Sequence, residues 1–209
     1  HDMEAIGRRF SPGRALEAAR ERRDRTYDPA LADLFLAHGG AWFERLATAD
    51  PWVEVLALEP QPRRLLQGAA LDDALHIAAD FVDLKSPFRA GHSRRCAQLS
   101  LDAARVLGFE ADDATALYHA ALVHDIGITG VPNSVWDKPG PLTTSEFDRV
   151  QLHTLLTEQI LRRAPALDHL NPVACAHHEK LDGSGYHRRL RAGGIDAGAN
   201  VLAAADIYV

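Results

Sequence analysis

Apolar residues recur along most of the chain at the three- and four-residue spacing of amphipathic helices. In the segment LDDALHIAADFVDLK, this spacing places Leu71, Leu75, Ala78, Ala79 and Val82 on one helical face. Similar periods run through the later segments, up to the end of the chain. No period-two strand pattern or hairpin turn interrupts them. The pattern therefore predicts an all-α protein.

Local signals predict where several of these helices begin and end. A capping side chain precedes a proline at the first helical position in three places, Ser11-Pro12, Asp28-Pro29 and Asp50-Pro51. Thr143 and Glu146 have the spacing of a capping box. Gly39-Gly40 predicts the end of a helix that begins near residue 30, and VACAHHEK predicts a helix that carries a histidine doublet.

The proline-rich run EPQPRR predicts a linker between two parts of the chain. Residues 1–70 are expected to form an N-terminal helical segment and this linker. Residues 71–209 are expected to form the main domain. Because the last predicted helix is cut off at the end of the sequence, this domain is expected to be truncated at its C-terminus.

Composition excludes several classes of protein. The chain has 209 residues, of which 46% are hydrophobic, and this composition supports a soluble protein with a hydrophobic core. No apolar run approaches the roughly 18–20 residues of a membrane helix. The formal net charge of −6 argues against nucleic-acid binding by this fragment. The two cysteines, Cys96 and Cys175, imply no disulfide framework, so we expect a cytoplasmic protein.

Side chains that commonly bind metals stand on or beside apolar helical faces at five places. They are His92, His124-Asp125, His153, His177-His178 and Asp206. A carboxylate after the apolar run LAAA, such as Asp206, would be costly to bury unless it is paired or metal-bound. Helices of a bundle project such groups inward, where they can converge on two metal ions. Imidazole and carboxylate suit zinc, iron or manganese, and such ions activate water for phosphoester hydrolysis.

The segments that carry these residues resemble the HD-GYP branch of the HD phosphohydrolase superfamily. The matching stretches are DLKSPFRAGHSRR, ALVHDIG with GVPNSVWDKPGPLT, EFDRVQLH, HHEKLDGSGY and AAADIY, in family order. The resemblance implies a helical bundle around a binuclear iron or manganese site that hydrolyses cyclic di-GMP or a related phosphoester. It implies, position by position, the ligands His92, His124, Asp125, His153, His177, His178 and Asp206. Asp125 would be the bridging ligand and the catalytic residue.

Three positions depart from the family pattern. The family's HDxGK motif has a lysine that approaches the scissile phosphate, and here that position is Ile128. The proline of GYP is replaced by His187. A glutamate that some members use for a third metal is replaced by Phe88, so we expect two metal ions.

The loop after the histidine doublet carries the candidate substrate-binding residues. The resemblance places Tyr186 against substrate or in packing. His187 is either a proton donor or loop surface. Arg188, Arg189 and Arg191 either bind phosphate or form a solvated basic loop.

The resemblance also leaves alternatives open. The motif variant is similar to a subgroup attached to LuxR-type helix-turn-helix regulators, which implies a DNA-binding domain in the full-length chain. The chain would then be a sensory, metal-binding domain of a transcription regulator with little or no catalysis. A third alternative is oxygenase chemistry at a di-iron centre. Residues 1–70 either resemble the tail of a preceding HD-type domain or form an ordinary helical cap. Whether the protein forms a homodimer is left open by the sequence.

Overall fold

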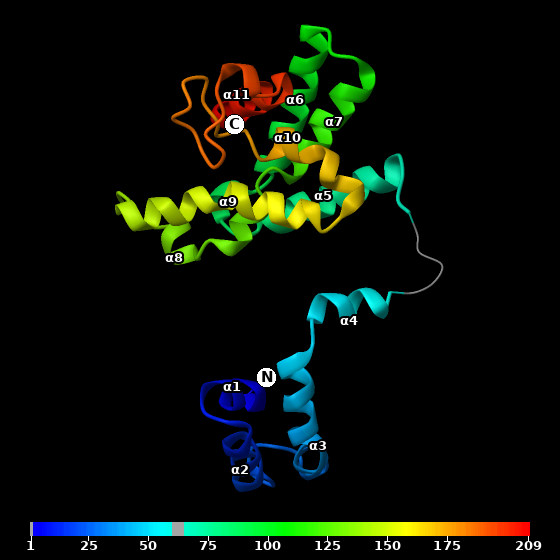
Figure 1. Ribbon diagram of the computed structural model, residues 1–209, viewed down its shortest axis with the longest axis vertical. Coiled ribbons are helices and arrows are strands. Elements are labelled where there is room, and N and C mark those ends of the chain that lie inside the picture. Colours follow the sequence, from blue (N-terminus) through cyan, green and yellow to red (C-terminus); the bar gives the residue numbers. More distant parts are fainter. Residues whose placement is uncertain (1, 60–64) are drawn as a thin grey trace. The chain divides into compact units, whose positions relative to one another are not determined.

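The structure is a computed structural model that describes residues 2–59 and 65–209. The chain divides into two compact units, His1–Leu65 and Leu66–Val209. Residues 60–64, which belong to the predicted linker, lie outside the described part. Figure 1 shows the helices of both units.

All regular secondary structure within the described residues is helical, apart from one isolated bridge between Arg23 and Tyr27. The prediction of an all-α protein is therefore confirmed. None of the described helices is long and apolar enough to cross a membrane.

Residues 2–59 of the first unit form four helices. Their bounds are α1 (Asp2–Arg9), α2 (Pro12–Arg22), α3 (Pro29–Thr48) and α4 (Pro51–Ala57). The predicted caps are confirmed, because the side chains of Ser11, Asp28 and Asp50 accept hydrogen bonds from backbone N–H groups in the first turns of α2, α3 and α4. These starts depend on neighbouring residues alone, which is why the sequence predicts them.

The predicted end of α3 at Gly39-Gly40 is wrong, because the helix continues through both glycines to Thr48. Gly39 is buried against Leu16 of α2 and Phe35 of its own helix. A Cβ atom on Gly39 would lie 2.9 Å from a Leu16 methyl carbon. The glycine therefore permits close packing of α2 on α3 and does not stop the helix.

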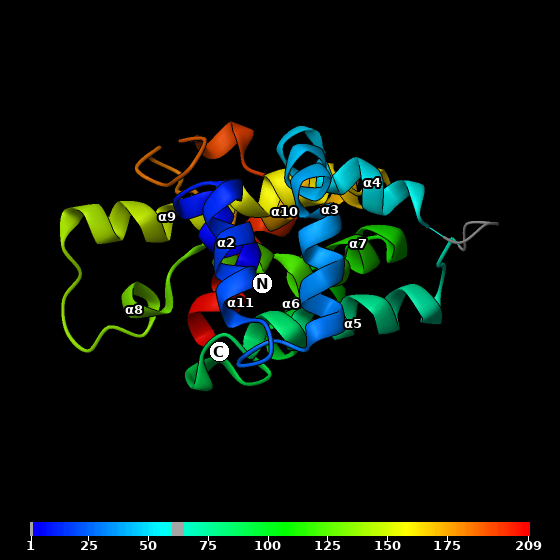
Figure 2. The same cartoon turned by 90° about the horizontal axis from the view of Figure 1, so that it is seen from below.

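The second unit is a helical bundle. Its helices are α5 (Ala69–Asp83), α6 (His92–Leu107), α7 (Ala111–Val123), α8 (Asn133–Trp136), α9 (Thr144–Arg162), α10 (Asn171–Ala174) and α11 (Ala197–Tyr208), with short 3₁₀ turns η1 (Pro87–Arg89), η2 (Ile126–Gly130), η3 (Pro165–Leu170) and η4 (Ala192–Gly194). Helix α6 packs against α7, α5 and α11, and α9 packs against η2 and α10. Figure 2 shows α5, α6 and α7 grouped in this unit.

Alanine makes up much of the core of the second unit. Buried residues from α5, α6, α7, α9, α10 and α11 form one cluster, which includes Leu75, Ala97, Ala104, Leu117, Ala120, Ala121, Leu161, Ala174 and Leu202. Small side chains let helix backbones approach closely, and the larger leucines fill the spaces between them. Both cysteines are buried and free, as the sequence predicts.

One predicted helix signal of the second unit is confirmed, and another is wrong. Thr143 and Glu146 form the predicted capping box at the start of α9. Helix α6 ends at Gly108, which has a left-handed φ of 76°. The predicted helix over VACAHHEK is shorter than expected, because α10 ends at Ala174. His177 and His178 therefore lie in a turn, where neighbouring side chains need not point about 100° apart as in a helix.

Candidate metal centre

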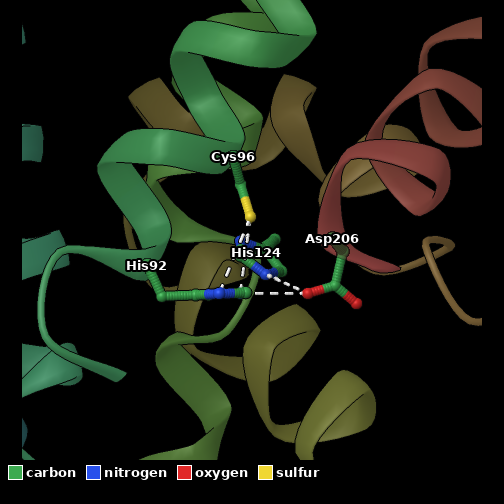
Figure 3. Close-up of side chains that lie close together, drawn as sticks. All are labelled: His92, Cys96, His124 and Asp206. Carbon is green, nitrogen blue, oxygen red and sulfur yellow. Dashed lines mark hydrogen bonds and ion pairs between the residues drawn. The ribbon is translucent and has the colours of Figure 1, made fainter. Parts of the chain in front are cut away.

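Four of the predicted ligands come from segments that are far apart in the sequence. His92 is the first residue of α6, His124 and Asp125 directly follow α7, and Asp206 lies in the last turns of α11. Figure 3 shows His92, His124 and Asp206 pointing toward one another. The packing of α6 against both α7 and α11 brings them together.

The distances in this first group suit a shared ion. His92 Nε2 lies 3.0 Å from Asp206 Oδ1, and His124 Nε2 lies 3.6 Å from the same oxygen. When two ligand atoms bind the same ion, each at about 2.0–2.2 Å, the separation between the two atoms is similar to these nitrogen–oxygen distances. His92, His124 and Asp206 can therefore hold one metal ion.

Cys96 lies beside this group but is a poor fourth ligand. Its sulfur is 3.4 Å from His92 Nε2 and 3.9 Å from His92 Nδ1. A sulfur on the lone-pair axis of Nε2 would be farther from Nδ1 by nearly the width of the ring. The sulfur therefore packs beside the imidazole, and burial raises the pKa of the Cys96 thiol to about 12, which disfavours the thiolate.

The second group consists of three histidines. His153 comes from α9, whereas His177 and His178 come from the turn after α10. One ring nitrogen from each lies within 4.8 Å of the others. The ring centroids of His153 and His178 are 5.1 Å apart. This group can hold a second ion.

Asp125 lies between the two groups and is buried. Its Oδ2 is 3.2 Å from His124 Nε2 in the first group. Its Oδ1 is 3.3 Å from His153 Nε2 and 3.6 Å from His177 Nε2 in the second. Each carboxylate oxygen thus faces a different group of histidines, which is the arrangement required of a bridging ligand.

Backbone carbonyls fix the tautomers of three of these histidines. In each one, Nδ1 lies 2.6–2.7 Å from the carbonyl oxygen three residues earlier: His124 from Ala121, His153 from Val150 and His177 from Ala174. A carbonyl oxygen only accepts hydrogen bonds, so Nδ1 carries the proton and donates it. Nε2 of each ring is then directed at the centre, as in metal-binding histidines.

Several buried atoms of the centre lack suitable partners among the described residues. His153 Nε2 and His177 Nε2 face each other at 3.5 Å, although Nδ1 of both rings is already the donor. His124 Nε2 and Asp125 Oδ1 are buried and accept or donate no hydrogen bond. Opposed lone pairs and an unpartnered carboxylate oxygen are costly unless a cation lies between them. The residues present therefore fit a pair of metal ions.

The electrostatics of the centre agree with this fit. Burial, together with the charges of His177 and His153, lowers the pKa of His178 to about 3. Burial opposes protonation of His124, but the carboxylates of Asp125 and Asp206 raise the pKa of His124 to about 10. The lowered pKa keeps His178 neutral, which is the form that binds a metal, whereas an ion held by His124 would displace a proton.

Gly127 lets α9 pack closely against the segment that follows His124 and Asp125. A Cβ atom on Gly127 would lie 1.9 Å from the carbonyl oxygen of His153 and 2.5 Å from the backbone nitrogen of Thr157. Gly127 N–H donates to Thr157 Oγ1, and this hydroxyl donates to the carbonyl of His124. The contact fixes the first histidine group relative to the second.

The predicted substrate-binding loop is only partly directed at the centre. The ring of Tyr186 lies 4.9 Å from that of His178, so Tyr186 borders the second group. His187 is neither loop surface nor directed at the metal groups, since its ring nitrogens lie 3.0 Å from Thr154 Oγ1 and 2.7 Å from Glu158 Oε2. Arg188 forms an ion pair with Glu158 as well. Arg189 and Arg191 are exposed.

Sequence reasoning missed one residue of the centre, Arg89. Its side chain is 14% exposed, and Nη2 donates to Asp125 Oδ2. Phe88, which stands at the position of the third-metal glutamate, is 85% exposed and takes no part, and Ile128 is fully buried. A basic residue three positions before His92 was the available signal, but the matching stretch DLKSPFRAGHSRR assigns it no role.

Comparison with known proteins identifies the family. The family model described as "HD domain" matches residues 76–209. The chain therefore belongs to the HD domain family, and its relatives support the HD-GYP branch that the motifs indicate. The match covers most of the second unit, which contains all seven predicted ligands.

Two curated relatives are named for cyclic-dinucleotide hydrolysis. The 3'3'-cGAMP-specific phosphodiesterase 3 of Vibrio cholerae is 37% identical over 93% of this chain and 43% of its own length. The cyclic di-GMP phosphodiesterase of Thermotoga maritima is 33% identical over 65% of this chain and 37% of its own length. This chain thus spans less than half of either relative.

A solved structure supports the fold. The crystal structure of a cyclic GMP-AMP-specific phosphodiesterase of Vibrio cholerae matches 99% of this chain and 48% of its own, with a TM-score of 0.56 and 31% identity. The helical architecture inferred from the sequence is therefore that of an HD domain.

Proposed function

We propose that this chain carries the catalytic domain of a metal-dependent phosphodiesterase that hydrolyses a cyclic dinucleotide, with cyclic di-GMP or 3'3'-cGAMP as substrate. The position of Asp125 between the two histidine groups carries the proposal. The names of the relatives support the substrate class, because both molecules contain two phosphodiester groups linking purine nucleotides.

Two divalent ions, iron or manganese by family resemblance, would occupy the centre. His92, His124 and Asp206 would hold one ion, and His153, His177 and His178 the other, with Asp125 bridging them. When bound, such ions act as Lewis acids that lower the pKa of water and stabilise negative charge on phosphoryl oxygens. Asp125 would keep the ions close enough together to serve one phosphodiester.

The remaining residues would orient the ligands and the substrate. The backbone carbonyls of Ala121, Val150 and Ala174 hold the three histidine rings in the tautomer that binds metal. Tyr186 offers an aromatic surface beside His178, where a ring or ribose of a nucleotide can pack. No serine or cysteine nucleophile is required by this arrangement.

A direct test measures metal content together with manganese- or iron-dependent release of linear product from both cyclic dinucleotides. Two ions per chain and turnover that is lost in Asp125→Ala are the expected results. Two ions without turnover of either substrate would instead favour a regulatory, metal-binding domain, which the apolar Ile128 at the lysine position also favours. Absence of bound metal would contradict both functions.

A further inference from the structure

Arg89 reaches the metal centre from a segment that otherwise faces solvent. It is the last residue of η1, and its neighbour Phe88 is 85% exposed, whereas the Arg89 side chain is 14% exposed. The guanidinium carbon lies 5.6 Å from the ring centroid of Trp136. The aromatic face therefore supports the cation while one edge of the guanidinium contacts Asp125.

The guanidinium has more hydrogen-bonding capacity than its neighbours use. An arginine side chain has five N–H donors. Nη2 donates to Asp125 Oδ2, whereas Nε is buried and has no hydrogen-bond partner among the described residues. Asp83 Oδ1 is 4.0 Å from Nε, and both Asp83 oxygens already accept hydrogen bonds from Ser93. The side chain is thus held in the centre with donors to spare.

Basic side chains that are close in sequence to His92 or His178 have other partners. Arg188 pairs with Glu158, Arg94 with Asp80, and Lys85 donates to Asn133. Among the ion pairs of the described residues, the pair that joins a guanidinium to a predicted ligand is that of Arg89 with Asp125.

We propose that Arg89 binds a non-bridging oxygen of the substrate phosphodiester, and this inference rests on the function proposed above. Metal ions that bind Asp125 would neutralise the carboxylate that now holds the guanidinium. Arg89 would then present its donors to a phosphate located on the same ions. Arginine binds phosphate oxygens through two parallel N–H groups, which a lysine at residue 89 would not reproduce.

The test measures binding without turnover, using a hydrolysis-resistant phosphorothioate analogue of cyclic di-GMP and of 3'3'-cGAMP. Titration calorimetry on the metal-loaded chain would compare the wild type with Arg89→Gln and Arg89→Lys. Arg105→Gln is the matched control, because Arg105 is exposed and pairs only with Asp102 on its own helix among the described ion pairs. Metal content and the thermal unfolding midpoint are measured for every variant.

The inference predicts that Arg89→Gln raises the dissociation constant roughly 10- to 100-fold, as expected for the loss of hydrogen bonds to a charged group. Arg89→Lys should lie between Arg89→Gln and the wild type, Arg105→Gln should match the wild type, and all variants should retain their metal. If Arg89→Gln does not fold, Arg89→Lys decides: weaker binding with full metal content supports the inference, and unchanged binding overturns it.

The outcomes separate this inference from the proposed function. Equal affinity of wild type and Arg89→Gln, with wild-type turnover intact, overturns the role of Arg89 alone. Loss of metal in Arg89→Gln also overturns it, because Arg89 would then only support Asp125. Binding that depends on Arg89, without turnover by the wild type, supports the inference and contradicts the proposed hydrolysis. No analogue binding by the wild type overturns both.

Discussion

His187 Nε2 lies 2.7 Å from Glu158 Oε2, so the loop that carries Tyr186 is tied to α9. Glu158 is 6% exposed and also pairs with Arg188 and Arg162. Where the related motif has a rigid proline, this chain has a histidine whose two ring nitrogens are both engaged. In this chain, hydrogen bonds of the His187 side chain therefore fix the loop, where the related motif relies on the rigid backbone of proline.

Glu158→Gln should loosen this loop. The amide would keep the shape of the side chain but lose the charge that pairs with two arginines. We expect the free energy of unfolding to fall by roughly 1–3 kcal/mol, measured by urea denaturation. Gln159→Glu is a suitable control, since the neighbouring Gln159 is exposed on α9. Equal denaturation midpoints for Glu158→Gln and the wild type would show that the pairs contribute little.

Gly127→Ala should disrupt the packing of α9 on η2, the turn that follows His124 and Asp125. The new methyl group would lie 1.9 Å from the His153 carbonyl oxygen, so the backbone itself must move. We expect a loss of about 3 kcal/mol or more in the free energy of unfolding, together with weaker metal binding. Gly193→Ala, where a Cβ atom meets nothing within 4 Å, should change stability by no more than about 0.5 kcal/mol. A normal metal content in Gly127→Ala would contradict the expected coupling.

The capping box at the start of α9 should make stability depend on pH in the acidic range. The hydrogen bond from Lys138, followed by those from Thr143, lowers the pKa of Glu146 from 4.5 to about 2. Because the pKa of Glu146 is lower in the folded state than in the unfolded state, its ionised form stabilises the fold at pH values above the unfolded-state pKa. This contribution is lost as the pH falls from about 4.5 toward 2. Thermal midpoints measured across this range should therefore fall more steeply for the wild type than for Glu146→Gln. Parallel curves would contradict the prediction.

Single-ligand variants should separate the two proposed ions. His92→Ala should lose the ion of the first group, and His178→Ala that of the second, so each should retain one ion per chain. Asp125→Ala should weaken both. Elemental analysis after gel filtration measures these contents, with the exposed His169→Ala as control. Two ions retained in His92→Ala would remove His92 from the ligand set.

The sequence predicts local features of this fold better than distant ones. The caps at Ser11, Asp28 and Asp50 and the capping box at Thr143 depend on residues within one helical turn, and all are confirmed. The continuation of α3 through Gly39 depends on a contact with another helix, which no local pattern encodes.

The same distinction applies to the candidate site. The ordered motifs were sufficient to select seven residues that the structure brings into two adjoining groups around Asp125. The position of Arg89 in the site could not be predicted from neighbouring residues, because its partners Asp125 and Trp136 lie 36 and 47 positions further along the chain. The anchoring role of His187 was missed for the same reason, since Glu158 lies 29 positions earlier.

The hydrogen bonds from Nδ1 of His124, His153 and His177 to carbonyls three residues earlier join each ring to its own backbone turn. Unwinding any of these turns would release the ring and weaken its hold on an ion. By thermodynamic reciprocity, a bound ion must resist that unwinding to the same extent. The affinity for the proposed ions would therefore depend on the integrity of these three turns, and chelation should raise amide hydrogen exchange first in them.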